Sequence, residues 1–130
     1  MKTSILVIAH NEEKYIEKCI KSLLQQTEPA HEIVLVVHNS TDQTKEIAQK
    51  YPITIITYSG PEGIVYARLE GLRHVSGDII ICTDGDSYVA NTWCSVMKQT
   101  LTESTVLVGS WVKFSGNLFV ASEKSVFDDL

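Results

Sequence analysis

Two aspartates that follow a short apolar run could hold a divalent metal ion. The run spans residues 79–83 and leads directly into Asp84-Gly85-Asp86. Carboxylate oxygens are the ligands that Mg²⁺ and Mn²⁺ prefer, and such ions keep open coordination positions for phosphate oxygens. Gly85 has no side chain, so a ligand could approach its backbone closely. An Asp-Gly pair after a strand is also typical of a plain solvent-exposed turn, which leaves a structural role open.

Other motifs built on acidic or glycine-rich loops do not fit the sequence. An EF-hand loop that starts at Asp84 would need a glycine and a glutamate where Val89 and Ser95 stand. The sequence contains no Gly-x4-Gly-Lys loop, no Gly-x-Gly-x-x-Gly after the first apolar run and no Gly-x-Ser-x-Gly elbow. These observations argue against P-loop NTPases, typical dinucleotide-binding domains and α/β-hydrolases.

Alternating apolar runs and amphipathic segments must position the two carboxylates. Such alternation predicts parallel βαβ units, and therefore an α/β fold with three layers and a mostly parallel sheet between helices. Right-handed crossovers bring the C-terminal ends of the strands to one edge of the sheet, which is where ligands bind in such folds. The predicted strands cover residues 3–9, 32–37, 53–58, 78–83 and 105–114, and the predicted helices cover 12–26, 40–50, 64–75 and 91–101.

Particular residues should begin or shape these helices. Asn11 is the expected N-cap of the first helix, and Ser40 and Gln43 have the spacing of a capping box for the second. Gly71 lies in the middle of the third helix, where glycine costs about 1 kcal/mol relative to alanine. A close approach of that helix to the sheet would explain the glycine.

Length and composition fit one globular domain, which we take to be residues 1–130. The chain is 44% hydrophobic and carries a net charge of −5 without a cluster of lysines and arginines, so nucleic acid is not an expected partner. No apolar run approaches the roughly 20 residues of a membrane span. We expect a cytoplasmic protein, or one peripheral to the inner face of the membrane. The three cysteines, Cys19, Cys82 and Cys94, are expected to be buried thiols.

Four segments in order resemble the family-2-type inverting glycosyltransferases, which have the GT-A fold. Residues 4–12 are similar to the opening strand and turn of that family, and 32–44 to its second strand and Ser-Thr-Asp-Gly-Thr loop. Residues 63–78 are similar to its Gly-x-x-x-Ala-Arg-Asn-x-Gly stretch, and Asp84-Gly85-Asp86 stands at its DxD motif. The resemblance covers about residues 1–114, the N-terminal nucleotide-sugar-binding half, and leaves 115–130 as an unassigned tail.

The resemblance implies a hexosyltransferase-like enzyme with a nucleotide-diphosphate sugar donor and an Mn²⁺ or Mg²⁺ ion. A UDP-sugar is the first expectation and a GDP-sugar the second, with a saccharide or lipid hydroxyl as acceptor. The metal would offset the charge that develops on the leaving nucleoside diphosphate. The implied nucleotide-sugar-binding residues are Ala9, His10, Glu12, His38, Asn39, Arg68, Asp84 and Gly85, and the implied metal ligands are Asp86 and Asp84.

Several positions depart from the family pattern. His10 replaces the usual tyrosine, and His38 and Asn39 stand in the segment where an aspartate often reads the base, so the choice of base stays open. His10 and Glu12 could instead be ordinary turn and helix-start residues, and Arg68 could pair with Glu62 or Glu70. No segment after residue 114 aligns with the acidic motif that supplies the general base. We therefore expect donor binding more than turnover from this chain.

Other functional classes remain as alternatives. The main one is a non-catalytic nucleotide-sugar-binding module completed by a partner or a second copy; apolar residues near 105–120 favour a homo-oligomer. Haloacid-dehalogenase-type enzymes also use Asp-x-Asp, but usually after the first strand and with threonine or valine where Tyr88 stands. A receiver-like signalling domain would need an aspartate after the third strand, where Ser59-Gly60 stands.

Overall fold

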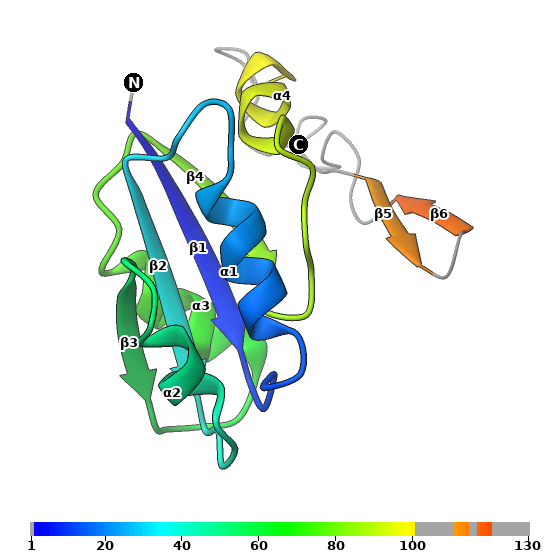
Figure 1. Cartoon of the computed structure of the whole chain (residues 1–130). Helices are drawn as coiled ribbons and strands as arrows, with labels where there is room; N and C mark the ends of the chain where they lie inside the picture. Colours follow the sequence, from blue (N-terminus) through cyan, green and yellow to red (C-terminus); the bar gives the residue numbers. More distant parts are fainter. Residues whose placement is uncertain (1, 101–110, 115–116, 121–130) are drawn as a thin grey trace.

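The computed structural model describes residues 2–100, 111–114 and 117–120, in which strands and helices alternate along most of the chain (Figure 1). The elements are β1 (Thr3–Ala9), α1 (Ile16–Leu24), β2 (Glu32–His38), α2 (Thr44–Ala48), β3 (Thr54–Tyr58), α3 (Ile64–Leu72), β4 (Ile79–Asp84), α4 (Trp93–Thr100), β5 (Trp111–Phe114) and β6 (Asn117–Val120). The alternation of β1 to α4 matches the sequence prediction.

The main sheet has four parallel strands in the order β3-β2-β1-β4. β1 lies inside the sheet, and Ile5 pairs with Ile33 of β2 on one side and with Ile81 of β4 on the other. All seven residues of β1 are buried, as expected of a strand that is covered on both faces. The C-terminal ends of the four strands therefore meet at one edge, as predicted.

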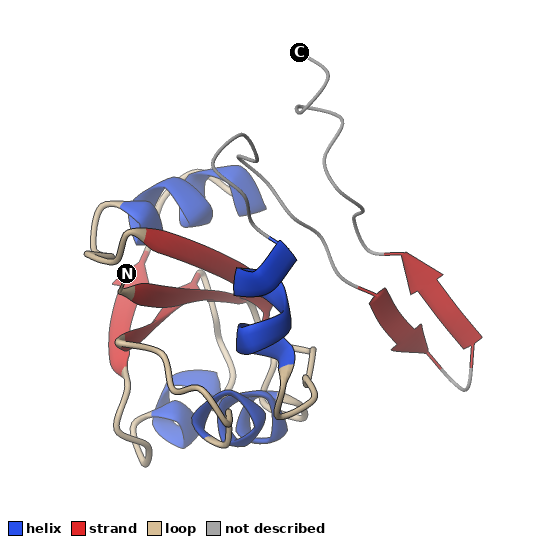
Figure 2. Cartoon of the chain, turned by 90° about the horizontal axis from the view of Figure 1, so that it is seen from above, coloured by secondary structure: helices blue, strands red, loops and turns tan. Residues whose placement is uncertain are grey.

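Helices cover both faces of this sheet, which confirms the three-layer α/β/α architecture (Figure 2). On one face, Ile5 and Val7 pack with residues of α1, with Ala48 of α2 and with Cys94 of α4. On the other face, residues of β1 and β2 pack against Ala67 of α3. The period of two along β1 sends alternate side chains to the two layers.

Gly71 lets α3 lie close against the sheet, as its position in the sequence predicts. A Cβ atom added at Gly71 would lie 2.4 Å from Leu6 Cδ1 and 2.9 Å from Val36 Cγ2. Both of these side chains are fully buried, so they have little room to move away.

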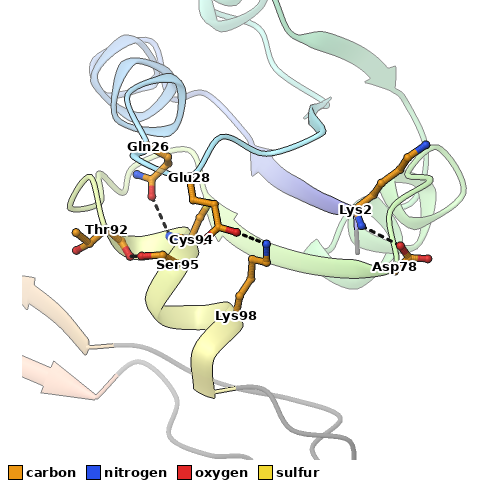
Figure 3. Close-up of polar contacts among 8 residues, drawn as sticks. All are labelled: Lys2, Gln26, Glu28, Asp78, Thr92, Cys94, Ser95 and Lys98. Carbon is orange, nitrogen blue, oxygen red and sulfur yellow. Dashed lines mark hydrogen bonds and ion pairs between the residues drawn. The ribbon is translucent and has the colours of Figure 1, made fainter.

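Buried hydrogen bonds attach α4 to the end of α1 (Figure 3). The Gln26 side chain is 5% exposed; its Nε2 donates to the Ala90 carbonyl, and its Oε1 accepts from the backbone N–H of Cys94 at the start of α4. Lys98 also pairs with Glu28, which precedes β2. These contacts fix the segment that leaves β4 and carries Asp86.

The first two helices begin later than predicted, and by different means. α1 begins at Ile16, and Asn11 does not cap it: Asn11 has a φ of 50°, and its Oδ1 accepts from the Thr41 backbone N–H. No capping box forms in the second helix either. Gln43 precedes α2 without a side-chain cap; Asp42 Oδ1 accepts from the Thr44 N–H at 3.0 Å, and Ser40 Oγ accepts from the Asn11 N–H at 3.0 Å.

Three further expectations meet different outcomes. β5 does not extend the parallel sheet but pairs antiparallel with β6, since a two-residue connection favours a local hairpin. Residues 105–110 lie outside the described residues.

Cys19 and Cys94 are buried, whereas Cys82 is exposed because it lies on the face of β4 that α3 leaves uncovered. None of the helices in the described part of the chain has the length and apolar character that crossing a bilayer requires.

Candidate functional site

Carboxylates converge at the C-terminal edge of the sheet. Asp84 is the last residue of β4, and a turn closed by a 3.1 Å bond from the Ser87 N–H to the Asp84 carbonyl follows it. The side chain of Asp84 is half-exposed at the end of β4, and Asp86 is exposed. Glu12 belongs to the loop after β1, and the charges of Asp86 and Asp84 act on its carboxylate.

These carboxylates repel one another. Burial, followed by the charges of Asp86, Asp42 and Asp84, raises the pKa of Glu12. Burial also raises the pKa of Asp84; Arg68 acts in the opposite direction, and Asp86 adds to the increase. An excess of negative charge that the protein itself does not neutralise is typical of a site that receives a cation.

Arg68 of α3 makes an ion pair with Asp84 of this cluster. Its Nη2 lies 3.9 Å from Asp84 Oδ1, which is an ion pair but too long for a hydrogen bond. Its Nε is buried and has no hydrogen-bond partner among the described residues. The expected alternative pair with Glu62 or Glu70 is absent from that part of the chain, and Glu70 instead pairs with Arg73 at 3.1 Å.

Two histidines lie side by side at the ends of β1 and β2. His10 follows Ala9, which pairs with Val37, and so His10 reaches His38. The ring centroids are 5.2 Å apart with 34° between the ring planes, and His10 Nδ1 lies 2.8 Å from the His38 carbonyl oxygen. Burial, and to a lesser extent His10, lowers the pKa of His38, so this ring favours its neutral form.

Reciprocal hydrogen bonds join the loop after β1 to the loop after β2. Thr44 Oγ1 accepts from the Glu12 N–H at 2.9 Å and donates to Asp42. Asp42 in turn accepts from the Glu13 N–H at 3.1 Å, and Glu13 accepts from the Gln43 N–H at 3.2 Å. Burial opposes the charge of Asp42, but the bonds from Thr44 and Glu13 hold its pKa below the usual value. The network fixes Glu12 in place.

Sequence reasoning did not find this network, although signals for it exist. Both strands end in the same dipeptide, His10-Asn11 and His38-Asn39, and both asparagines have positive φ angles, 50° and 49°. Asparagine tolerates this left-handed conformation better than most residues, and it turns the chain sharply after each strand. The paired turns bring the two loops into contact.

Three predicted site residues have structural partners. The Asn39 side chain exchanges two hydrogen bonds of 3.3 Å with the backbone of Gly60 and so holds the loop after β3. Ala9 is buried, with 1% of its surface exposed. A Cβ at Gly85 would lie 2.9 Å from the Ala9 Cβ and 3.3 Å from Ile16 Cδ1, so close packing already explains this glycine. Close approach of a ligand to Gly85 stays a prediction.

A metal ion at this edge would need ligands from a bound molecule. Within residues 2–100 and the short β5–β6 hairpin, no three His, Cys, Asp or Glu side chains are grouped as a complete metal site. The two carboxylates Asp84 and Asp86 nevertheless suit Mg²⁺ or Mn²⁺, which often bind through one or two carboxylates together with substrate phosphates. The donor set therefore fits a metal that binds with a diphosphate.

The hollows of the described surface do not by themselves identify the site. An open hollow of about 440 Å³ lies between α1 and the segment after β4, where Lys18 Nζ sits 3.7 Å from the centre of the Tyr88 ring. It includes none of the predicted site residues. A smaller hollow of about 120 Å³ at the ends of β2 and β3 includes Asn39. The charged side chains of Glu12, Asp84 and Arg68 are therefore a better indication of the candidate site than the depth of the surface is.

Relatives of known class match most of the chain. The glycosyltransferase EpsJ of Bacillus subtilis, described as uncharacterised, is 40% identical over 105 residues, which are 77% of this chain and 29% of EpsJ. The chain therefore spans less than a third of that relative. A crystal structure of Staphylococcus aureus TarS residues 1–349 in complex with UDP is similar at 28% identity and a TM-score of 0.65, over 76% of this chain and 31% of that one.

A second solved structure supports the fold. Glucosyl-3-phosphoglycerate synthase from Mycobacterium tuberculosis in complex with UDP superposes with a TM-score of 0.76 at 22% identity, over 87% of this chain and 45% of that one. The same synthase has been solved with Mn²⁺ and UDP. At this identity the similarity establishes the GT-A fold alone. The sequence model of glycosyl transferase family 2 matches residues 4–127. This chain belongs to glycosyl transferase family 2.

Proposed function

We propose that the carboxyl edge of the sheet binds a UDP-sugar with a divalent metal ion, as the donor site of a glycosyltransferase. The observation that carries the proposal is the pair of carboxylates at the end of β4, where Asp84 lies 3.9 Å from the Arg68 guanidinium and where burial, with Asp86 adding to the increase, raises the pKa of Asp84. The relative TarS, solved with UDP and with UDP-GlcNAc, supports uracil as the base.

The proposed roles follow from charge and reach. Asp86 and Asp84 would hold the metal, which neutralises charge on the diphosphate when it is bound. Arg68 would donate to the diphosphate, because its guanidinium has a buried Nε without a described partner and only a 3.9 Å contact to Asp84. Arginine is well suited to phosphate oxygens since its donors lie in one planar fork.

Other residues would shape the nucleoside part of the site. His10 and His38 end the two strands next to Glu12 and would contact the base, while Ala9 and Gly85 would form the floor through their backbone. Glu12 would accept a hydrogen bond from a ribose hydroxyl. The hydrogen bond from the Glu12 N–H to Thr44 would hold the loop in place for this contact. Asn39 would act as a positioning residue, because its amide is bound to Gly60.

The proposal also includes transfer of the sugar from the donor to an acceptor. The reaction would be attack of an acceptor hydroxyl, of a saccharide or lipid, on the anomeric carbon, with UDP leaving. An inverting reaction needs a general base that removes the hydroxyl proton. We assign the role of this general base to no residue within 2–100.

Calorimetric titration with UDP, with and without Mn²⁺, tests the donor site. We expect binding that requires Mn²⁺ and that falls about 100-fold in Asp86→Ala, since loss of a carboxylate removes a metal ligand. Asp78→Ala is a matched control, because Asp78 accepts a hydrogen bond from the Lys2 N–H at the opposite edge of the sheet. Equal affinity of the wild type and Asp86→Ala for UDP would refute the metal role, and no binding by the folded wild type would refute the donor site.

A further inference from the structure

The contact between His10 and the main chain of β2 determines which His10 nitrogen carries hydrogen. His10 Nδ1 lies 2.8 Å from the His38 carbonyl oxygen. A carbonyl oxygen can only accept a hydrogen bond, so Nδ1 must be the donor. A neutral imidazole has one N–H, and the other nitrogen, Nε2, is then an acceptor. The fold thus assigns the tautomer of His10.

The remaining ring nitrogen of His10 is open to a ligand. His10 is exposed, and its ring contacts the His38 carbonyl oxygen through Nδ1. His38 Nδ1 is buried without a hydrogen-bond partner in the described part of the chain, and the two ring centroids are 5.2 Å apart.

We propose that His10 is a specificity-determining residue that reads the nucleobase, with Nε2 accepting a hydrogen bond from a ring N–H of the base. This inference rests on the proposed donor site. Uracil, thymine and guanine carry a ring N–H on the edge used for pairing, whereas cytosine and adenine have a bare ring nitrogen there. The site therefore selects the first group.

His38 acts through His10 as a positioning residue. Its carbonyl oxygen holds the Nδ1 hydrogen, and its ring packs at 34° to the His10 ring. Because the protein holds the Nδ1 hydrogen of His10, Nε2 is left as the acceptor that can meet the base.

Comparison of UDP with N3-methyl-UDP isolates this hydrogen bond. Both probes have the same diphosphate, so the ratio of their affinities cancels the metal, the phosphate titration and the contacts of Arg68. We expect the wild type to bind UDP about tenfold more tightly at neutral pH, the effect of one neutral hydrogen bond in a partly desolvated site.

Two substitutions separate a hydrogen bond from stacking or from a steric clash with the methyl group. His10→Phe keeps a flat ring but has no acceptor, so the affinity ratio should fall to about one. His10→Gln keeps a neutral acceptor, so it should retain part of the preference for UDP. His31→Gln is the matched control, because His31 precedes β2 at the opposite edge of the sheet and should behave as the wild type.

Each outcome decides the matter. Equal binding of the two probes by the wild type, or an unchanged preference in His10→Phe, overturns the role of His10 and leaves the donor site standing. Binding of neither probe, by a chain whose circular dichroism shows it to be folded, overturns the donor site and the role of His10 together. Loss of the preference in His10→Phe, with His31→Gln unchanged, establishes His10 as the base-reading residue.

Discussion

The two edges of the parallel sheet carry similar residues in opposite electrostatic states. At the N-terminal edge, Glu32 accepts from Ser4 Oγ at 2.6 Å, from the Ser76 N–H at 2.5 Å and from Ser76 Oγ at 3.0 Å. These bonds, led by the one from Ser4, lower the pKa of Glu32. At the C-terminal edge, burial and neighbouring carboxylates raise the pKa of Glu12 and Asp84.

The difference separates a structural carboxylate from a binding one. Glu32 is satisfied from within the fold, and Ser4 extends the cluster by accepting from the Gly77 N–H at 2.8 Å, so this edge joins β1, β2 and the loop before β4. Among the residues that the structure describes, the Asp84 carboxylate has only the 3.9 Å contact to Arg68. Polarity at the end of a strand is therefore a weak sign of function, and a shortage of partners is a stronger one.

Removal of Arg68 should give the largest effect on binding and a small effect on the fold. Arg68→Ala is expected to weaken UDP binding about 100-fold, as is typical when one partner of a desolvated charge pair is truncated. Calorimetry measures the affinity. Its free energy of unfolding should stay close to that of the wild type, because the Asp84 contact is long and half-exposed. Unchanged UDP affinity would contradict the contact with the diphosphate.

Removal of Glu32 should show the reverse pattern. Glu32→Ala leaves the buried Ser4 hydroxyl without its acceptor and should lower the free energy of unfolding by about 2 kcal/mol. Because the folded-state pKa of Glu32 is lowered, its contribution is present above the unfolded value near 4.5 and is lost as the pH falls through the folded value. Urea titrations at pH 7 and pH 3 should therefore show a larger difference from wild type at pH 7, while UDP affinity stays unchanged.

The loop network at the binding edge should affect both properties. Thr44→Val keeps the shape of the buried side chain but removes the acceptor for the Glu12 N–H and the donor to Asp42. We expect a loss of about 1 kcal/mol in stability. UDP affinity should also fall several-fold, since Glu12 is no longer held. A loss of stability with full UDP affinity would show that the network does not position Glu12.

The smallest effect should be a gain in stability. Asp84→Asn removes a charge whose folded-state pKa is raised, so the protonated side chain stabilises the fold below the unfolded pKa and this contribution is lost as the pH rises. At neutral pH and without metal, Asp84→Asn should be more stable than the wild type by about 0.5 kcal/mol, a value reduced by solvent screening. Thermal unfolding in the presence of a chelator measures this difference.

The sequence was sufficient to predict the strands and helices that follow from the spacing of apolar residues. The apolar runs of β1, β2 and β4, separated by helices, dictate a parallel sheet, and handedness then places His10, His38 and Asp84 at one edge. Gly71 also predicted the close approach of α3. Each of these inferences uses local pattern and general geometry, and so needs no knowledge of which loops touch.

Contacts between loops were beyond reach of that reasoning. Asn11 was predicted to cap its own helix, but its left-handed backbone directs the side chain to Thr41, thirty residues away. The polar partners of Glu12 and Arg68 likewise depend on register between strands. A fifth strand was predicted over residues 105–114, but its apolar pattern does not reveal its partner, and β5 pairs antiparallel with β6.

The most direct test measures stability and UDP binding together in Asp84→Asn and Glu32→Ala. The account predicts that Asp84→Asn unfolds at a higher temperature than the wild type without ligand but gains no stability from UDP and Mn²⁺. It predicts that Glu32→Ala unfolds at a lower temperature yet gains as much from UDP and Mn²⁺ as the wild type does. If Asp84→Asn is stabilised by UDP and Mn²⁺ as strongly as the wild type, the carboxyl edge is not the donor site.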